Sequence, residues 1–357
     1  MPRIVAASTA FPRHYYEQEK LASALLRFAG AGQCSLEPEL VARLFKSVAV
    51  GGRHLALPIE AYADLASLEQ PNSAWLEVAL EIGETAVRGA LQKAKIAPES
   101  LNLFVSNTTT GIAAPSLEAR VMNKLGFSTR CRRTPLFGLG CAGGAAGIAR
   151  VSDYLRAYPE HAAVLLCVEL CSLTFQRSDS SVANVIACGL FGDAAACVVL
   201  VGDEHALAAR AGPRVVANES VFFPNTERMM GWDVVDSGFR VVLNSGIPDL
   251  ARTAVAESIR SFLRNRGLGT RDIGRWVVHP GGPAVIDALE RGLELRPGTL
   301  DHSRDCLRRI GNLSSVSVLA LLNEVMESPE TPTGAGLLLA MGPGFGAELS
   351  LLEWSSN

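Results

Sequence analysis

Apolar residues recur along this chain with two different periods, one helical and one typical of strands. Between Trp75 and Lys95 they return every three or four positions, which predicts an amphipathic helix, and the run from Asn102 to Asn107 predicts a strand after it. The sequence then turns at Gly140-Cys141 and continues as a helix from Ala142 to about Tyr158. Alternation of helices and strands indicates an α/β protein.

The same order of elements returns in the second half of the chain. A predicted helix from about Asp249 to Asn265 leads to the predicted strand Trp276 to His279. The turn Gly311-Asn312 follows, and an apolar helix runs from Ser314 to about Met326. Each half then closes on apolar strands, from Ala194 to Val201 in the first and within 335–353 in the second.

The spacing of the turns agrees between the halves. Thr108 and Cys141 are 33 positions apart, and so are His279 and Asn312. The sequence therefore predicts two similar α/β halves, residues 1–210 and 211–357, packed against each other.

The helix after Cys141 opens on six small residues, Ala142 to Gly147, three of them glycine. Such an opening has poor helix propensity, because each Gly costs about 1 kcal/mol relative to Ala. It is favourable where backbones must approach closely. We therefore expect this helix to be buried between two sheets, with a flexible loop as the alternative.

Composition narrows the possible functions. The chain has 357 residues, of which 48% are hydrophobic and 19% charged, as in a compact protein with a large interior. A formal net charge of -3 gives no basic surface, so no nucleic-acid partner is expected. No window approaches about 18 uninterrupted apolar residues, so no membrane span is expected. Because residues 1–5 do not resemble a signal peptide, we expect a cytoplasmic enzyme.

Eight cysteines and six histidines raise the question of a metal site. The chain has no CxxC pair, and the histidines are scattered along it. Zinc sites usually combine such pairs at short spacing, so no metal is expected.

Cys141 stands where an apolar strand breaks into a helix. The start of a helix carries partial positive charge, which stabilises a thiolate and lowers the pKa of a cysteine. The glycines beside it let a ligand approach the sulfur. A cysteine at such a turn is also found in ordinary cores, so the feature alone leaves both interpretations open.

His279 and Asn312 occupy comparable turns in the second half. His279 ends an apolar strand and is followed by Pro280 and Gly281, while Asn312 follows Gly311 before a helix. Taken singly, a buried core histidine and a helix-capping asparagine explain them equally well. Together with Cys141 they form a set of groups that can handle a thioester.

Five motifs resemble those of the type III polyketide synthases, the chalcone-synthase family, and they are spread in the right order over nearly the whole chain. They are Gly140 to Gly144 (GCAGG), Leu190 to Ala196 (LFGDAAA), His279 to Pro283 (HPGGP), Gly311 to Ser315 (GNLSS) and Gly342 to Gly346 (GPGFG). The resemblance implies the thiolase fold, a five-layered αβαβα assembly of two duplicated halves, and a homodimer. It also implies acyl-CoA and malonyl-CoA as substrates, with no metal or redox cofactor.

The resemblance implies roles for single residues as well. Cys141 would take the starter acyl group from coenzyme A. His279 would help to keep Cys141 as a thiolate and, with Asn312, would donate hydrogen bonds to the thioester oxygen of malonyl-CoA, which stabilises the enolate formed as carbon dioxide leaves. Phe191 would be the gatekeeper between the CoA tunnel and the cavity, and Lys46 would contact CoA phosphates, although a solvated surface lysine explains it nearly as well.

The resemblance also places residues at the substrate pocket. We expect these to be Thr109, Thr110, Thr174, Gly231, Ser314, Gly342, Pro343 and Gly344. The segment 229–240 is similar to the bacterial and fungal alkylresorcinol and alkylpyrone synthases. Small residues there predict a medium- or long-chain fatty acyl-CoA starter, extended by two or three malonyl units to an alkylpyrone or alkylresorcinol. The family's second gatekeeping phenylalanine has no clean counterpart, because Arg240 occupies the expected place and Phe239 is offset.

Two rival enzyme functions use the same cysteine. A ketoacyl synthase of the CoA-priming kind shares Cys, His and Asn, and condenses once with an acyl carrier protein, but its histidine motif usually differs from the one at 279–283. In a cysteine-dependent thioester hydrolase, water attacks the acyl group on Cys141 instead of an enolate. A non-catalytic scaffold is a third reading, which the intact three-motif set disfavours.

Overall fold

The computed structural model describes residues 1–30, 36–328 and 333–354. Within this part of the chain, nine strands form one mixed sheet in the order β11-β12-β13-β8-β1-β7-β6-β4-β5. The strands of the first half are β1 (Arg3–Ala10), β4 (Leu103–Asn107), β5 (Arg132–Leu136), β6 (Ala162–Leu170) and β7 (Asp193–Val201). Those of the second half are β8 (Arg214–Phe222), β11 (Arg275–Val278), β12 (Gly334–Gly342) and β13 (Gly346–Trp354).

The two halves repeat one pattern of strand pairing. In the first half β4 runs parallel to β6, β6 antiparallel to β7, and β7 antiparallel to β1. In the second half β11 runs parallel to β12, β12 antiparallel to β13, and β13 antiparallel to β8. The halves join where Arg3 of β1 pairs with Arg214 of β8.

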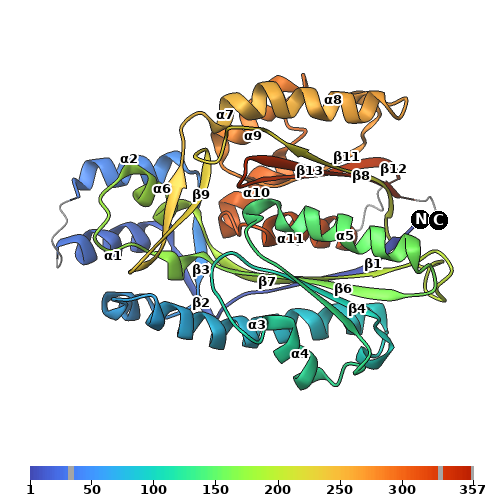
Figure 1. The fold of residues 1–357 in the computed structure, drawn as a ribbon. Helices are drawn as coiled ribbons and strands as arrows, with labels where there is room; N and C mark the ends of the chain where they lie inside the picture. Colours follow the sequence, from blue (N-terminus) through green and yellow to red (C-terminus); the bar gives the residue numbers. More distant parts are fainter. Residues whose placement is uncertain (31–35, 329–332, 355–357) are drawn as a thin grey trace.

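Helices cover both sheet halves and fill the space between them (Figure 1). One outer layer contains α3 (Glu69–Ala94) and α4 (Leu117–Leu125), and the other contains α8 (Ala256–Arg264), α9 (Pro283–Gly292) and α10 (Asp301–Ile310). The middle layer consists of α5 (Gly143–Ala157) and α11 (Val316–Glu327). This five-layered αβαβα order is the thiolase fold that the sequence predicted.

The middle helix α5 is buried as its small residues predicted. Ten of its residues are buried, among them Gly143, Gly144 and Gly147. A Cβ atom added to Gly144 would lie 2.3 Å from the carbonyl oxygen of Ser315, and one added to Gly147 would lie 2.4 Å from the Leu165 side chain. The glycines therefore allow the close approach of α5 to α11 on one side and to β6 on the other.

The boundaries of other predicted elements differ in detail. The helix predicted over 249–265 is one run made of α7 (Ile247–Leu250), a π-helical turn (Ala251–Val255) and α8. The strand β11 ends at Val278, so His279 stands just beyond it. No helix in the described ranges is long and apolar enough to cross a membrane.

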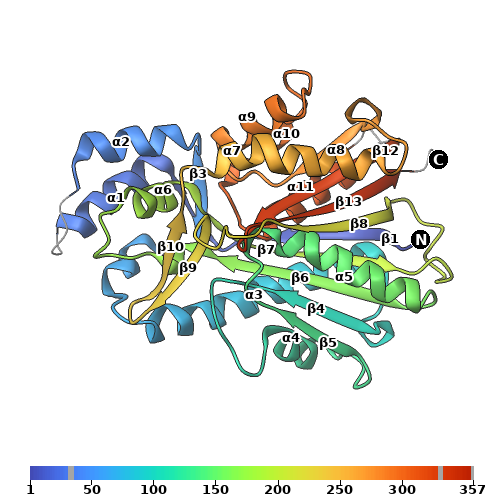
Figure 2. The same cartoon turned by 45° about the horizontal axis from the view of Figure 1, so that its top comes forward.

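A smaller group of elements packs beside the end of the sheet at which β4 and β6 finish (Figure 2). It comprises α1 (Gln18–Gly30), α2 (Pro38–Ser47), α6 (Val182–Leu190), the β2–β3 pair (His14–Glu17 and Gly52–Leu55) and the β9–β10 hairpin (Met230–Val235 and Gly238–Leu243). These elements form one side of the cavities described next.

Candidate active site

A cavity of about 540 Å³ lies where the two middle helices begin. Cys141 from the first half lines it together with His279 and Asn312 from the second. The structure thus brings the three predicted catalytic residues to one space. Further predicted residues on its wall are Thr109, Phe191, Gly231, Ser314 and Pro343.

Cys141 lies in a short 3₁₀ turn, Gly140–Ala142, that runs directly into α5. Gly140 has φ +48°, and a Cβ atom there would lie 2.5 Å from the ring of Pro343. Glycine at this position therefore satisfies both the left-handed backbone and the close approach of the 342–344 loop. The Cys141 thiol donates a hydrogen bond to the Ser314 hydroxyl, with an Sγ to Oγ distance of 3.6 Å.

His279 is held at the end of β11 by its backbone N–H, which donates to the Leu339 carbonyl oxygen at 2.8 Å. Its side chain is 2% exposed, and among the described residues its Nδ1 atom has no hydrogen-bond partner. Burial lowers the pKa of His279 to about 4, so the imidazole is neutral in the resting site at pH 7. A neutral imidazole on the cavity wall can accept a proton.

Asn312 is fixed through its backbone to the end of α6. Its N–H donates to the Leu190 carbonyl oxygen and its own carbonyl oxygen accepts from the Gly192 N–H, both at 2.9 Å. The side-chain Oδ1 accepts from the Ser314 N–H at 2.8 Å. The amide Nδ2 makes a long contact of 3.4 Å with the Gly281 carbonyl oxygen, so its N–H groups retain capacity for a ligand.

Burial acts against the thiolate expected at Cys141. It raises the pKa of the thiol to about 12; the Ser314 hydrogen bond lowers it, and the Glu169 carboxyl raises it further. The start of α5 acts in the opposite direction, since it favours negative charge. Because burial also favours the neutral form of His279, a charge on either group is least costly when the other carries the opposite charge.

Glu169 is a buried group of the site that sequence reasoning missed. It is 0% exposed, near the end of β6, and burial raises its pKa to about 7. The hydroxyls of Thr110 and Ser315 donate to its carboxyl at 3.0 and 2.6 Å, as does the Thr109 N–H at 3.1 Å. The signal was present, since Glu169 is the single charge in the apolar run Ala162–Leu170.

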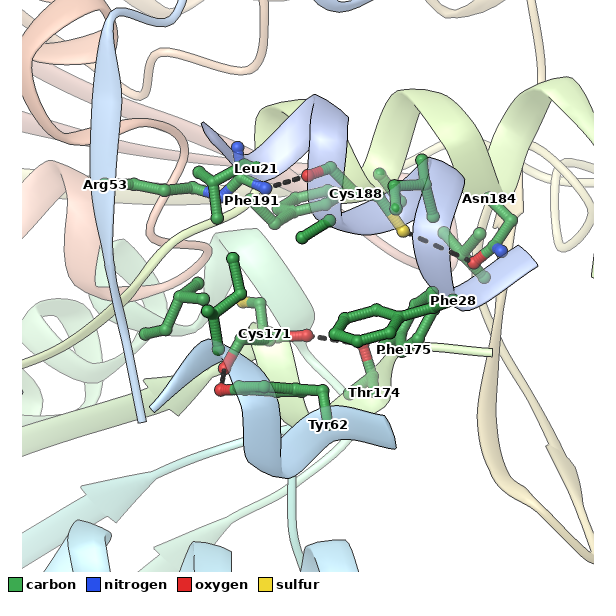
Figure 3. Close-up of a pocket in the computed structure, with 17 residues that line it drawn as sticks. Leu21, Phe28, Arg53, Tyr62, Cys171, Thr174, Phe175, Asn184, Cys188 and Phe191 are labelled. Atoms are coloured by element: carbon green, nitrogen blue, oxygen red, sulfur yellow. Dashed lines mark hydrogen bonds between the residues drawn. The ribbon is translucent and has the colours of Figure 1, made fainter. Parts of the chain in front are cut away.

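Phe191 and Val241 separate the main cavity from a second, apolar cavity of about 80 Å³, because these two residues line both. The second cavity lies among α1, α6 and the segments around Tyr62 and Cys171 (Figure 3). Val241 stands at the partition, one residue after Arg240, the position at which the resemblance placed a second gatekeeper. Arg240 instead points outward to Asp233, at 3.3 Å, since alternate residues of a strand face opposite sides.

The remaining predicted pocket residues lie in different places. Thr110 turns its hydroxyl to Glu169, and Thr174 lines the second cavity. Gly342 packs against the backbone before α5: a Cβ atom there would lie 2.3 Å from the Leu139 carbonyl oxygen. Gly344 is likewise in the loop behind the wall, with φ +127°.

Lys46 is an exposed residue of the last turn of α2. The next two residues, Ser47 and Val48, line the main cavity. Its position beside the cavity therefore suits a contact with CoA phosphates, while its side chain stays in solvent. Among the described residues no group of three or more His, Cys, Asp or Glu side chains is arranged to hold a metal ion.

Comparison with known proteins places this geometry in context. The family model of the chalcone and stilbene synthase N-terminal domain matches residues 2–204, and the C-terminal domain model matches residues 214–354. The chain is 47% identical over 356 residues to a 1,3,6,8-tetrahydroxynaphthalene synthase of Streptomyces peucetius subsp. caesius, which covers 98% of this chain and 93% of the relative. It is 35% identical over 368 residues to a putative chalcone synthase of Bacillus subtilis (strain 168), with full coverage of both (100% and 100%).

A solved structure agrees over almost the whole length. The crystal structure of 1,3,6,8-tetrahydroxynaphthalene synthase from Streptomyces coelicolor A3(2), a bacterial type III polyketide synthase, superposes with a TM-score of 0.92 at 30% identity. The match covers 99% of this chain and 100% of that one.

Proposed function

The chain belongs to the chalcone and stilbene synthase family and is a type III polyketide synthase; on this premise we propose that it extends a medium- or long-chain fatty acyl-CoA with malonyl-CoA and releases an alkylpyrone or alkylresorcinol. Enzymes of this family catalyse decarboxylating condensation of malonyl-CoA, act on CoA thioesters and need no additional cofactor. The observation that carries the proposed starter is the apolar cavity beyond Phe191 and Val241.

In the proposed loading step, the Cys141 thiol gives its proton to the His279 imidazole. The thiolate then attacks the carbonyl carbon of the acyl-CoA, a bond forms between that carbon and the sulfur, and coenzyme A leaves as a thiolate that takes up the imidazolium proton. Burial penalises each charge on its own, and attraction between the two opposite charges offsets part of that penalty when they form together. The α5 N-terminus adds further stabilisation of the thiolate.

In the proposed extension step, Asn312 and His279 donate hydrogen bonds to the thioester oxygen of malonyl-CoA. The bond from the malonyl α-carbon to its carboxylate breaks, carbon dioxide leaves, and the negative charge collects on that oxygen as an enolate. The Nδ2 atom of Asn312 has spare capacity for this charge. The enolate carbon then attacks the thioester on Cys141, and the ketide chain passes to the CoA moiety before it is loaded again.

The cavity walls favour an aliphatic starter. The second cavity lies on the far side of the partition from Cys141. Its apolar lining residues are Leu21, Ala24, Leu25, Phe28, Leu55, Ile59 and Phe175. Burying each methylene of a chain there contributes about 0.8 kcal/mol. A starter made only of malonyl units offers no such surface to this wall.

A second product class follows from the relatives rather than from the cavities. The relatives named 1,3,6,8-tetrahydroxynaphthalene synthase reach 47% identity, and the compound in that name is a polyhydroxylated aromatic without an alkyl chain. In that case malonyl-CoA alone would supply both starter and extender units.

Product mass spectrometry separates these alternatives. The purified enzyme is incubated with malonyl-CoA alone and with malonyl-CoA plus acyl-CoA of six to sixteen carbons, without acyl carrier protein. Alkylpyrones or alkylresorcinols whose masses follow the acyl chain support the proposal. A single product formed from malonyl-CoA alone, unaffected by acyl-CoA, would replace it with the tetrahydroxynaphthalene class.

The same incubation tests the rival chemistries. Free fatty acid without malonyl-CoA consumption would indicate a thioester hydrolase, and turnover that requires acyl carrier protein would indicate a ketoacyl synthase. We further propose a cytoplasmic homodimer. The exposed Phe137 follows β5, the outermost strand of the sheet, and lies four residues before Cys141, so a partner at this edge would cover it. Analytical ultracentrifugation tests the dimer: a monomeric mass would contradict it.

A further inference from the structure

The partition between the two cavities is built from elements that are far apart in sequence. Phe191 follows the end of α6, and Val241 lies in β10 of the β9–β10 hairpin. The hairpin forms a separate two-stranded sheet, so the nine-stranded sheet does not fix its position through strand pairing. Some other contact must therefore set the distance between the hairpin and α6.

Gln176 makes such a contact, in addition to the Leu68 N–H, which donates to the Asp236 carbonyl oxygen in the hairpin turn at 3.2 Å. The Gln176 side chain is 4% exposed, and its Oε1 atom accepts a hydrogen bond from the Ser237 hydroxyl at 2.6 Å. Its Nε2 atom donates to the carbonyl oxygens of Ser237 at 3.4 Å and Phe239 at 3.3 Å. Two of these bonds reach Ser237 in the turn, and the third reaches Phe239 in β10, two positions before Val241.

Asn184 connects the same segment to α6. Its Nδ2 atom donates to the backbone carbonyl oxygens of Gln176 at 2.9 Å and Asp179 at 2.7 Å. Asn184 is buried in the first turn of α6, whose last residue precedes Phe191, and it faces the second cavity together with Phe191 (Figure 3). Two buried amides therefore link one side of the partition to the other.

We propose that Gln176 is a positioning residue, held in turn by Asn184, and we call these two amides the brace. The brace keeps Val241 beside Phe191 and thereby sets how long an acyl chain can pass from the catalytic cavity into the apolar one. A buried amide that is hydrogen-bonded to backbone groups holds that backbone in position, because displacement would leave buried polar groups unpaired. With the brace intact, the partition sets an upper limit to the length of chain that passes. Without it, the hairpin can move and the two cavities merge.

The test measures kcat/KM for acyl-CoA of six to sixteen carbons in the wild type, Gln176→Leu and Ser237→Ala. We expect the ratio of kcat/KM for the best chain length to kcat/KM for the longest chain to fall roughly tenfold in Gln176→Leu, the effect of one or two lost hydrogen bonds. In Ser237→Ala, which removes only the shortest bond and no bulk, a smaller shift in the same direction is expected. Ser237→Ala keeps the proposal testable if Gln176→Leu does not fold.

A matched control is Asn102→Leu. The Asn102 amide also holds backbone, by accepting from the Ala162 N–H at 3.0 Å, but it lies before β4, at the end of the sheet away from the cavities. It should lose stability without any change in chain-length preference. A Gln176→Leu profile that matches the wild type, with a melting temperature lowered as in Asn102→Leu, would overturn the brace.

The chain-length measurement rests on the proposed starter class, but different results would contradict the starter proposal and the brace. If the wild type ignores acyl-CoA and uses malonyl-CoA alone, the starter proposal fails. The brace is then tested by the number of extensions, since a growing chain meets the same partition. Gln176→Leu should shift the ratio of longer to shorter ketides by several fold, while Asn102→Leu should not. An unchanged ratio would refute the brace independently.

Discussion

The turn before α5 and the turn before α11 occupy matching places in the two halves, yet they present different chemistry to the same cavity. The first carries the thiol of Cys141 and the second the amide of Asn312. The ends of the matching strands differ in the same way, since Thr108 follows β4 where His279 follows β11. The duplicated fold thus places two turns and two strand ends at one cavity, and the different residues at these positions provide the reactive groups. Neither half contains a complete site.

The two middle helices also differ in how they begin. α5 opens on glycine and alanine, while α11 opens on Val316 and larger apolar residues. Small residues are needed on α5 where the two helices meet, because Gly144 packs on the Ser315 carbonyl oxygen. The distance from Cys141 to the second-half groups therefore depends on the absence of a side chain in the first half.

The strongest test of the comparison removes the first half's contribution. Cys141→Ala should abolish acyl loading and polyketide formation, because the matching residue Asn312 cannot act as a nucleophile. Malonyl-CoA decarboxylation should remain measurable, since His279 and Asn312 are intact. Liquid chromatography with mass detection measures both, and polyketide formed at more than trace levels would contradict the assignment.

Asn312→Ala removes the second half's matching group. Loss of one donor to a developing oxyanion typically slows a reaction about 100- to 1000-fold, so malonyl-CoA decarboxylation should fall by that amount. Acyl transfer to Cys141 should stay measurable, because the thiol and His279 remain. If loading fails instead while decarboxylation survives, the roles given to the two turns are wrong.

His279→Ala tests whether Cys141 ionises alone or as a pair. Burial raises the pKa of the thiol, so without an imidazole to take the proton, alkylation by iodoacetamide should rise about tenfold per pH unit from pH 7 to 9, whereas a wild type that forms the thiolate–imidazolium pair should show a flatter profile. At pH 7 it should be roughly 100-fold slower than in the wild type, a usual loss for a missing base. Identical pH profiles for the two proteins would show that His279 does not share the proton.

Gly144→Ala tests the contact between the two middle helices. The added methyl group would meet the Ser315 carbonyl oxygen at 2.3 Å, and the helices must separate. We expect a destabilisation of about 1–3 kcal/mol in urea unfolding, together with a roughly tenfold fall in kcat from misplaced groups. Gly83→Ala in α3 is a control, because a Cβ atom there would make only ordinary contacts, at 3.5 Å, with the Leu166 and Val168 side chains; its activity should stay near that of the wild type.

The smallest effect concerns Glu169 in β6, whose matching strand β12 is apolar throughout. Burial raises the pKa of Glu169 to about 7 from 4.5, so the folded protein binds this proton more tightly than the unfolded chain does. The resulting stabilisation is fully present below pH 4.5 and is lost as pH rises through 7. Relative to Glu169→Gln, the wild type should therefore lose up to about 3 kcal/mol of unfolding free energy between pH 4.5 and 8.

The comparison is made by urea unfolding at several pH values. Asp193, whose pKa burial also raises, is present in both proteins and cancels in the difference. A difference between wild type and variant that does not change with pH would show that Glu169 is ionised in the folded protein throughout this range.

The order of elements and the three reactive turns could be predicted from the sequence, because each rests on local signals. Cys141, His279 and Asn312 each stand beside glycine or proline, and the equal spacing of Thr108 to Cys141 and of His279 to Asn312 indicated the duplication. The burial of α5 was also predictable, since its glycines are costly in a helix unless backbones pack closely.

The surroundings of the site could not be predicted in the same way. The lone charge of Glu169 was visible, but which hydroxyls would meet it depends on contacts across 59 to 146 positions of sequence. The place of Val241 at the partition was not predicted: the resemblance put the second gatekeeper's position at Arg240, and a shift of one residue in a strand exchanges its two faces. The second cavity and the Gln176 brace arise only when α1, α6 and the hairpin are packed together.

The most direct test of the central claim is the mass of the protein after incubation with a single acyl-CoA in the absence of malonyl-CoA. In the wild type, intact-protein mass spectrometry should show one added acyl group, and peptide mapping should place it on Cys141. Asn312→Ala should carry the same adduct, and Cys141→Ala should carry none. An unmodified wild-type protein, or an adduct that persists in Cys141→Ala, would contradict the account.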